Sequence, residues 1–388
     1  MKKMNVAIIG DKFMGKAHSN AWRQAGLFFD IPITPVLKVA CGRNEGQLKE
    51  FAAKWGWEET ETDWKKVVER KDIDIIDVST PTFLHHDIVI AAAKAGKHIF
   101  CEKPMALNYA EAKEMYEAAK KGAGTHYINF NYRRCPAIVL AKQLIDEGKI
   151  GRIYHWRGCY LQSWIMDPTF PLTWHLRKET AGAGAHYDLN SHNMDLARFL
   201  VGEFKSVSGL TTNFITERPL PDESTARTFQ AGSTASGKGK VTVEDAALVM
   251  AEFENGALGS FEATRFALGR KNYNFFELYG SKGALGFNME RMNELQYYSE
   301  ADAEKERGFR TILATEPVHK YVANWWPPGH TIGYEHEHVH AVVDFLKAID
   351  TGTDIAPNLY DGMKVTQVLD AALESARLGK RINVADVR

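Results

Sequence analysis

The strongest constraint on the fold lies at the start of the chain, where a short apolar run ends in a glycine-rich turn. Val6 to Ile9 are continuously apolar, as expected of a strand buried on both faces of a parallel sheet. The turn Gly10-Asp11-Lys12-Phe13-Met14-Gly15 follows, and a helical pattern begins near Lys16. This order is typical of a dinucleotide-binding domain, because the turn directs backbone N–H groups and the helix dipole at a pyrophosphate. The alternative interpretation is an ordinary tight turn.

The alternation of strand and helix continues through the first third of the chain. Further apolar runs predict strands at 36–40, 73–78 and 98–101. Helical patterns occupy 88–95 and 109–121, and Asn108 is the expected N-cap of the second helix. We therefore expect an α/β fold in which a doubly wound parallel sheet forms a domain spanning 1–134.

The pattern changes near residue 150, and a second domain is expected over 135–388. Strand-like runs joined by turn signals predict an antiparallel sheet, and they lie at 153–161, 207–212, 247–253, 257–265 and 275–279. One helix is expected near 188–200, and C-terminal helices are expected within 334–378. A segment rich in Pro, Ser, Thr and Gly predicts a long surface loop over 217–240.

Composition excludes several classes of function. The 388 residues include 48 Lys plus Arg and 49 Asp plus Glu, so the net charge of −1 provides no electrostatic footprint for nucleic acid. No run of about 18 apolar residues exists, so no membrane-spanning helix is expected. The cysteines Cys41, Cys101, Cys135 and Cys159 show no close pairing, which favours a reduced, cytoplasmic protein.

The cofactor end departs from the usual fingerprint in two places. Lys12 replaces the middle glycine of G-x-G-x-x-G, which costs some backbone approach to the phosphates but adds a counter-charge. The second strand ends in Arg43, without a carboxylate before Glu45. An arginine there tolerates a 2′-phosphate and favours NADP slightly, while Asn44 or Glu45 could still bind the ribose of NAD. We therefore expect NAD or NADP, and Arg43 as a solvated surface residue is the alternative.

Residues able to do chemistry follow the ends of predicted strands, where ligands bind in open α/β sheets. Thr80-Pro81 with His85 follows the third strand, and Glu102-Lys103-Pro104 follows the fourth, where Pro104 disfavours a helical conformation at Lys103. The expected cofactor-binding residues are Gly10, Lys12, Phe13, Met14, Gly15, Arg43, Thr80, Pro81, His85, Glu102 and Lys103.

A second candidate group lies in the next domain. Asp188 and His192 are four residues apart, so on a helix they share a face. A carboxylate beside an imidazole can fix its tautomer, which suits a general base near neutral pH. An ordinary helix pair at 188 and 192, and a solvated surface lysine at 103, are the alternatives.

Taken together, these segments resemble the glucose–fructose oxidoreductase / inositol dehydrogenase / MocA (Gfo/Idh/MocA) family of NAD(P)-dependent oxidoreductases. The resemblance covers essentially the whole chain, and Tyr160-Leu161-Gln162 and Asn131-Tyr132-Arg133-Arg134 are most similar to its levoglucosan dehydrogenase branch. It implies a Rossmann domain followed by an α/β domain with an open, mostly antiparallel sheet that often forms the oligomer contact, here of a homodimer or homotetramer. It also implies that Lys103, Asp188 and His192 occupy the catalytic positions.

The expected reaction is oxidation of a secondary hydroxyl of a sugar, anhydrosugar, glycoside or inositol, with hydride transfer to the nicotinamide. His192 takes the hydroxyl proton, Lys103 polarises or orients the hydroxyl, and Asp188 holds His192 or a neighbouring hydroxyl. Aromatic faces and polar donors suit a polyhydroxylated ring, and the expected substrate contacts are Lys103, Tyr132, Arg133, Gln162, Trp164, Asp188 and His192. A glycosidase that retains its nicotinamide, and a non-enzymatic dinucleotide-binding regulator, remain as alternatives.

One further motif points to a different chemistry. The segment His336-Glu337-His338-Val339-His340 matches H-E-x-x-H, in which two histidines one turn apart bind zinc. Nothing near it uniquely supplies a third ligand in a chain already explained as a dinucleotide enzyme. We therefore expect no metal, and consider the segment a helix start with His336 as a candidate substrate contact.

Overall fold

The computed structural model describes residues 2–221 and 234–388, which divide into two compact units. The first unit comprises Met1–Arg134 and Gly333–Lys364, and the second comprises Cys135–Ile332 and Val365–Arg388. The division after Arg134 falls where the sequence pattern places it. The segment Gly333–Lys364, however, groups with the first unit instead of the second.

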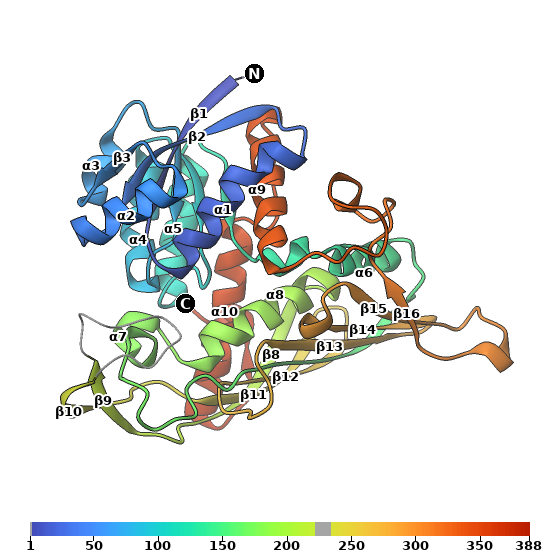
Figure 1. The fold of residues 1–388 in the computed structure, drawn as a ribbon. Helices are drawn as coiled ribbons and strands as arrows, with labels where there is room; N and C mark the ends of the chain where they lie inside the picture. The colour runs from blue at the N-terminus through green and yellow to red at the C-terminus, as the bar shows by residue number, and fades with distance from the viewer. Residues whose placement is uncertain (1, 222–233) are drawn as a thin grey trace. The chain divides into compact units, whose positions relative to one another are not determined.

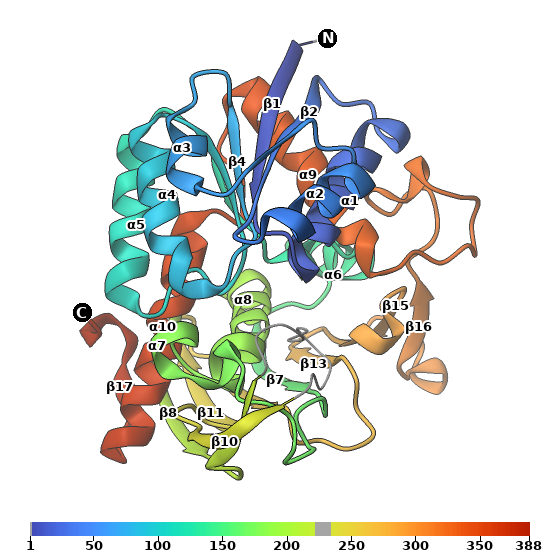
Figure 2. The same ribbon diagram turned by 60° about the vertical axis from the view of Figure 1, so that its left-hand side comes forward.

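The first unit is built on a six-stranded sheet in the order β3-β2-β1-β4-β5-β6, and all of its strand pairs are parallel. Its strands are β1 (Lys2–Ile9), β2 (Ile33–Cys41), β3 (Glu59–Glu61), β4 (Ile75–Val78), β5 (His98–Cys101) and β6 (His126–Ile128). Its helices are α1 (Phe13–Phe28), α2 (Glu45–Trp55), α3 (Trp64–Glu69), α4 (His85–Lys94), α5 (Tyr109–Lys121) and α9 (Tyr334–Thr351). Figure 2 shows α3, α4 and α5 on one face of this sheet and α1, α2 and α9 on the other.

Burial explains why these runs form strands and helices. Val6, Ala7 and Ile8 of β1 are fully buried, because helices cover both faces of the sheet. Helix α9 packs on α1, where the Trp22 ring contacts Phe345 at a centroid distance of 6.5 Å. The expected cap of α5 is present, since Asn108 Oδ1 accepts the Glu111 N–H at 2.9 Å. The predicted doubly wound sheet is thus confirmed, and α9 supplies part of its cover.

The second unit contains a nine-stranded sheet in the order β16-β15-β14-β13-β7-β12-β11-β8-β17. Its strands are β7 (Ile153–Leu161), β8 (Phe204–Thr212), β11 (Ala246–Phe253), β12 (Leu258–Thr264), β13 (Tyr273–Gly280), β14 (Gly283–Asn288), β15 (Glu294–Ser299), β16 (Arg310–Leu313) and β17 (Ile382–Asn383). All neighbours are antiparallel except β7 and β12, which confirms the mostly antiparallel sheet.

Helices cover one face of this sheet, as Figure 1 shows. They are α6 (Pro136–Asp146), α8 (Ser191–Leu200) and the greater part of α10 (Leu359–Leu378), while α7 (Lys178–Ala181) packs on the 3-10 turn Trp174–Leu176. The strand β11 alternates accordingly: Val249 is buried, whereas Leu248 and Met250 are 50% and 68% exposed. The opposite face of the sheet is therefore open and partly apolar.

Two expectations about local structure are corrected. The loop expected over 217–240 contains the paired strands β9 (Glu217–Pro221) and β10 (Thr234–Lys240), while 222–233 lie outside the described residues. The Arg218 side chain fixes β9 by donating to the carbonyls of Ile165 and Asp167, a long-range effect that composition does not encode. The helix expected near 188–200 begins as a π-helix over His186–Asn190 before α8. Among the described residues, no helix is both long and apolar enough to cross a membrane.

Candidate active site

The glycine turn after β1 has the shape of a phosphate cradle. Gly10 has a φ of +125°, and a Cβ there would lie 2.4 Å from the Ser79 carbonyl oxygen. A Cβ on Gly15 would lie 2.1 Å from the Gly10 carbonyl oxygen, so only glycine lets α1 begin this close to the turn. The N–H groups in the first turn of α1 have no carbonyl one turn earlier in the helix and can then bind an anion.

The structure also shows how Lys12 is tolerated at the middle position. Its φ of −94° lies in a region open to any residue, so no glycine is required there. The side chain is mostly exposed, and its Nζ donates to Gln47 Oε1 at 2.6 Å and lies 3.6 Å from Asp11 Oδ2. Phe13 and Met14 form the first turn of α1.

Arg43 follows the end of β2, and its side chain is available to bind a ligand. Asn44 Oδ1 caps α2 by accepting the Gln47 N–H at 3.0 Å, and the Glu45 carboxylate accepts from Lys49 at 2.7 Å. Arg43 is exposed and forms no hydrogen bond or ion pair within the described part of the chain. Asn44 and Glu45, which could bind a ribose, are therefore hydrogen-bonded to residues of α2, whereas Arg43 is not.

Two of the residues expected at the cofactor, His85 and Thr80, carry buried polar side-chain groups. His85 is buried, with Nδ1 3.1 Å from the Pro104 carbonyl and Nε2 2.9 Å from the Thr80 carbonyl. It links the segments that follow β4 and β5. The hydroxyl of Thr80 is buried and has no partner among the described residues, which fits a bound ligand at this edge.

Glu102 turns away from the surface. Its Oε1 accepts His18 Nε2 at 2.8 Å, and its Oε2 accepts the backbone N–H of Lys103 at 3.1 Å. Burial opposes ionisation, but the hydrogen bond and positive charge of His18 outweigh it and lower the pKa of Glu102 to about 2. Glu102 is thus placed to hold the backbone of Lys103, which is half-buried.

In the second unit, Asp188 binds an arginine that the sequence pattern did not single out. Arg265 Nη2 lies 2.8 Å from Asp188 Oδ2, and the guanidinium is 1% exposed. It stands 5.2 Å from the centre of the Trp164 ring, a cation–π distance. The Nε and Nη1 groups of Arg265 have no partner within 2–221 and 234–388. Arg265 directly follows β12, and no local sequence pattern indicated its pairing with Asp188.

A row of side chains continues from Trp164 towards His192. Trp164 Nε1 donates to Gln162 Oε1 at 2.8 Å, and Gln162 Nε2 donates to Asn272 Oδ1 at 3.2 Å. The Tyr160 hydroxyl also donates to Asn272, at 2.5 Å, and the Tyr160 ring lies 6.0 Å from the His192 ring. The structure therefore gathers Gln162, Trp164, Asp188 and His192 through Tyr160, Asn272 and Arg265. A direct pairing of Asp188 with His192 stays a prediction.

Tyr132 and Arg133 are placed differently from these. Both lie on the 3-10 turn Asn131–Arg134 of the first unit, and each is 3% exposed. Arg133 Nη2 lies 3.5 Å from Asp361 Oδ1. Their role as substrate contacts is untested, and their burial favours a structural one.

The H-E-x-x-H segment lies in the first turns of α9 and attaches this helix to the 3-10 turn Asn131–Arg134. His336 Nδ1 accepts the Gly333 N–H at 3.0 Å, and Glu337 accepts from Asn131 Nδ2 at 2.8 Å. His340 Nδ1 lies 2.9 Å from the Arg134 carbonyl. Burial lowers the pKa of His340 to about 3, so the ring is neutral and donates to that carbonyl. Because His336 and His340 each bind backbone at Nδ1, the segment is accounted for without zinc.

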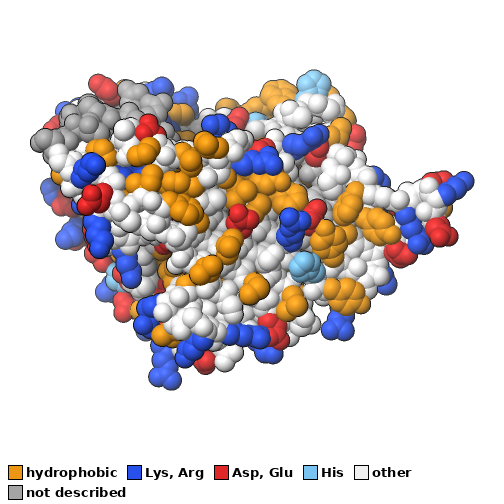
Figure 3. Space-filling model, turned by 90° about the horizontal axis from the view of Figure 1, so that it is seen from below, with side chains coloured by type: hydrophobic (Ala, Val, Ile, Leu, Met, Phe, Trp, Pro, Cys, Tyr) orange, Lys and Arg blue, Asp and Glu red, His pale blue; other side chains and the backbone are white. Residues whose placement is uncertain are grey.

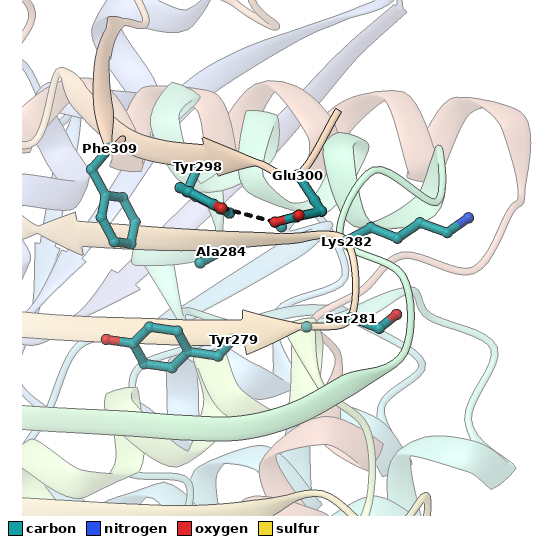
Figure 4. A pocket seen from close by; sticks show the side chains of 9 residues that line it. Tyr279, Ser281, Lys282, Ala284, Tyr298, Glu300 and Phe309 are labelled. Atoms are coloured by element: carbon teal, nitrogen blue, oxygen red, sulfur yellow. Dashed lines mark hydrogen bonds between the residues drawn. The ribbon is translucent and has the colours of Figure 1, made fainter. Parts of the chain in front are cut away.

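The described residues also contain a shallow pocket away from the predicted site. It has a volume of about 280 Å³ and is lined by the β13–β14 turn with Tyr298, Glu300 and Phe309. Figure 4 shows the Tyr298 hydroxyl directed at Glu300, a hydrogen bond of 2.8 Å. Glu300 also lies 2.7 Å from Arg307. Its charge is thus already matched, and none of the expected site residues lines this pocket.

Comparisons with known proteins identify the family of this chain. Residues 4–130 match the oxidoreductase family with an NAD-binding Rossmann fold, and residues 138–286 match the GFO/IDH/MocA C-terminal domain. Levoglucosan dehydrogenase of Pseudarthrobacter phenanthrenivorans is 43% identical over 100% of both chains. Myo-inositol 2-dehydrogenase of Thermotoga maritima is 28% identical over 73% of this chain and 74% of its own.

Solved structures extend the likeness. Levoglucosan dehydrogenase in complex with NADH and levoglucosan superposes with a TM-score of 0.93 at 44% identity, covering 99% of this chain and 100% of that one. An oxidoreductase domain protein from Kribbella flavida has a TM-score of 0.92 at 47% identity, with coverage of 99% and 100%. The resemblance inferred from the motifs is confirmed. The chain therefore belongs to the Gfo/Idh/MocA family of oxidoreductases and carries its NAD-binding Rossmann domain.

Proposed function

We propose that the protein is an NAD-dependent dehydrogenase that oxidises a secondary hydroxyl of a sugar, with an anhydrosugar such as levoglucosan as the first candidate. The observation that carries the proposal is the set of contacting polar and aromatic side chains that connects Asp188 with His192. Its intermediate members are Arg265, Trp164, Gln162, Asn272 and Tyr160. Aromatic faces next to fixed polar groups recognise the C–H and O–H groups of a sugar ring, and a histidine beside them supplies a base. The full-length likeness to levoglucosan dehydrogenase supports this choice of substrate.

The roles of the residues follow from their chemistry. Bound NAD supplies the hydride acceptor, and Gly10, Gly15 and the start of α1 are suited to hold its pyrophosphate. His192 removes the proton of the reacting hydroxyl. The Lys103 ammonium orients that hydroxyl, and Asp188 binds a neighbouring hydroxyl or steadies His192. Glu102 holds the backbone of Lys103 by accepting a hydrogen bond from the Lys103 N–H.

The assay that tests the proposal follows the absorbance of reduced nicotinamide. Levoglucosan, glucose, a glucoside and myo-inositol are supplied with NAD and, separately, with NADP. We expect NADH to accumulate with levoglucosan or a related pyranose, together with a ketone product. Free sugar released from the glucoside without net NADH would instead favour the glycosidase alternative. Absence of turnover with every substrate would contradict the proposal.

The same assay tests cofactor preference. We propose that NADP is accepted in addition to NAD, because Arg43 is exposed and unengaged while Asn44 and Glu45 are occupied. A 2′-phosphate can pair with a guanidinium at this position. Turnover with NADP at less than about one hundredth of the NAD rate would contradict this part of the proposal.

Replacement of Arg265 should weaken the substrate side of the site. Arg265→Met removes the charge bound to Asp188, and a displaced catalytic group can cost about 10²-fold in rate. We therefore expect kcat/KM to fall by that order, and the free energy of unfolding to fall by about 2 kcal/mol. Arg265→Lys, which keeps the charge, should recover part of the activity. Arg291→Met is the control, because Arg291 is exposed and pairs only with Glu294 among the described residues. Unchanged kcat/KM in Arg265→Met would contradict the role.

The open face of the sheet in the second unit is proposed as the contact of a homodimer or homotetramer. Figure 3 shows hydrophobic side chains on this face, and Leu210, Leu248, Met250 and Leu258 are each at least 50% exposed there. A stable interface buries about 800 Å² per partner. Met250→Lys should therefore raise the dissociation constant at least about tenfold in sedimentation velocity. Val318→Lys, at an 82% exposed position outside the sheet, is the control. A monomeric wild type would contradict the proposal.

A cytoplasmic location is proposed from the cysteines. Cys41, Cys101 and Cys135 are buried, Cys159 is half-buried, and all four are free thiols. Proteins in oxidising compartments more often pair their cysteines.

A further inference from the structure

A buried ion cluster lies under the carboxyl edge of the sheet in the first unit. His18 of α1 stands between two carboxylates: its Nδ1 is 2.8 Å from Asp77 Oδ1, and its Nε2 is 2.8 Å from Glu102 Oε1. Asp77 belongs to β4, and Glu102 directly follows β5. All three side chains are at most 4% exposed. The cluster therefore joins α1 to the ends of the two strands that precede Thr80 and Lys103.

The contacts fix the charge of His18. An ionised carboxylate only accepts hydrogen bonds, so an imidazole whose two nitrogens face ionised carboxylates donates from both and carries a positive charge. Burial alone lowers the pKa of His18, but the charges and hydrogen bonds of Asp77 and Glu102 outweigh it and raise the pKa to about 10. Trp22 Nε1 donates to Asp77 Oδ2 at 2.7 Å, which satisfies a further lone pair of this carboxylate.

The second histidine of the cluster is neutral. His338 of α9 lies with its ring centre 5.5 Å from that of His18. Asn129 Nδ2 donates to Glu102 Oε1 at 2.5 Å and lies 3.0 Å from both His338 Nδ1 and His18 Nε2. Burial and the charge of His18 lower the pKa of His338 to about 3. The His18 imidazolium thus donates a hydrogen bond to each of two carboxylates, Asp77 and Glu102.

The group His18, Glu102 and His338 has the composition of a metal site, but its geometry does not favour one. Two ligand atoms of a tetrahedral zinc ion lie about 3.3 Å apart, given bond lengths near 2.0 Å. His18 and Glu102 are separated by only 2.8 Å, a hydrogen-bond distance, and the other nitrogen of His18 binds Asp77. The contact between His18 Nε2 and Glu102 Oε1 is therefore a hydrogen bond, with a proton between the two atoms instead of a metal ion.

The cluster ends at the proposed reactive lysine. Glu102 uses one carboxylate oxygen for His18 and the other for the backbone N–H of Lys103. We propose that His18 is a positioning residue for Lys103, acting through the Glu102 carboxylate without touching substrate or cofactor. This inference rests on the proposed function, in which Lys103 orients the reacting hydroxyl. Without the imidazolium, Glu102 must protonate or turn towards another donor, because an unpaired carboxylate is costly to bury. A turned Glu102 loses the Lys103 N–H, and a protonated Glu102 accepts it more weakly than an ionised carboxylate does.

The test compares His18→Gln with Trp22→Phe in the full-length protein. Both variants remove a hydrogen bond to Asp77, but only the first removes the charge that binds Glu102. For His18→Gln we expect the NADH dissociation constant and the KM for sugar to stay within about threefold, while kcat falls about 30-fold. Trp22→Phe should keep kcat within about threefold. Wild-type kcat in His18→Gln, or parallel losses of kcat and NADH affinity in both variants, would overturn the positioning role.

A second measurement covers the case in which His18→Gln fails to fold. ¹⁵N NMR of histidine-labelled wild type should show one imidazole with both nitrogens protonated at about pH 8.5, two units above the ordinary histidine pKa. A neutral His18 ring at that pH would overturn the inference. Wild-type protein that oxidises no sugar would refute the proposed function, and the positioning role with it, whereas a neutral ring in an active wild type refutes the inference alone.

Discussion

Lys103→Met should lower kcat for sugar oxidation by about 10³-fold, the range lost when a group that assists proton transfer is removed. Methionine keeps the length and apolar stem of the side chain but provides no ammonium group to orient the hydroxyl. The backbone N–H of residue 103 remains, so its hydrogen bond to Glu102 should persist. The dissociation constant for NADH, measured by fluorescence, should therefore change less than about threefold.

Lys113→Met provides the matched control for this experiment. Lys113 is an exposed residue of α5, so its loss should leave both kcat and NADH binding unchanged. If Lys103→Met turned over within threefold of the wild type, Lys103 would have no part in the reaction. If it lost NADH binding and kcat together, its role would be to bind the cofactor.

His192→Asn should also lower kcat steeply, by about 10²–10³-fold at neutral pH, because asparagine has no basic nitrogen to accept the hydroxyl proton. His192 is the second residue of α8, just after the π-helix, and its ring centre lies 6.0 Å from that of Tyr160. Since the contacts among Trp164, Gln162 and Asn272 do not involve it, the wall beside it should remain. The KM for sugar should therefore rise less than the kcat falls. The measurement is steady-state kinetics with saturating NAD.

The control for His192→Asn is His330→Asn in the same unit. His330 is exposed, and its ring binds the carbonyl of Pro327. The kcat and the KM for sugar of this control should both equal the wild-type values. An active His192→Asn variant would transfer the role of base to another group, and Asp188 would be the first to examine.

The fold of the first unit was largely predictable from local pattern. Continuous apolar runs marked β1, β4 and β5, and the Asn108 cap located the start of α5 to the residue. These features depend on burial on both faces and on nearby hydrogen bonds, which a sequence displays directly. The role of α9 was not predictable in this way, because Gly333–Lys364 joins the first unit from a distant part of the chain.

The same distinction holds for the candidate site. Lys103, Asp188 and His192 stand at strand ends or in a recognisable motif, and could be proposed from the sequence. Arg265 could not, because its partner Asp188 lies 77 positions away and only the packing of the π-helix His186–Asn190 against β12 brings the two residues together. In His336-Glu337-His338-Val339-His340, by contrast, the spacing alone points to a site that the sequence analysis did not adopt. The spacing of two histidines permits zinc, but His336 binds the backbone at the start of its own helix, and His340 binds the carbonyl of Arg134.

The central claim is that hydride passes from a sugar carbon to NAD, and isotope transfer tests it most directly. Levoglucosan deuterated at its carbinol positions, one at a time, is incubated with the enzyme and NAD, and the nicotinamide product is analysed by mass spectrometry. Deuterium from one carbon should appear in NADH in equal amount to the ketone formed, and Lys103→Met should abolish the transfer. Levoglucosan consumed with no label in the nicotinamide would contradict the claim.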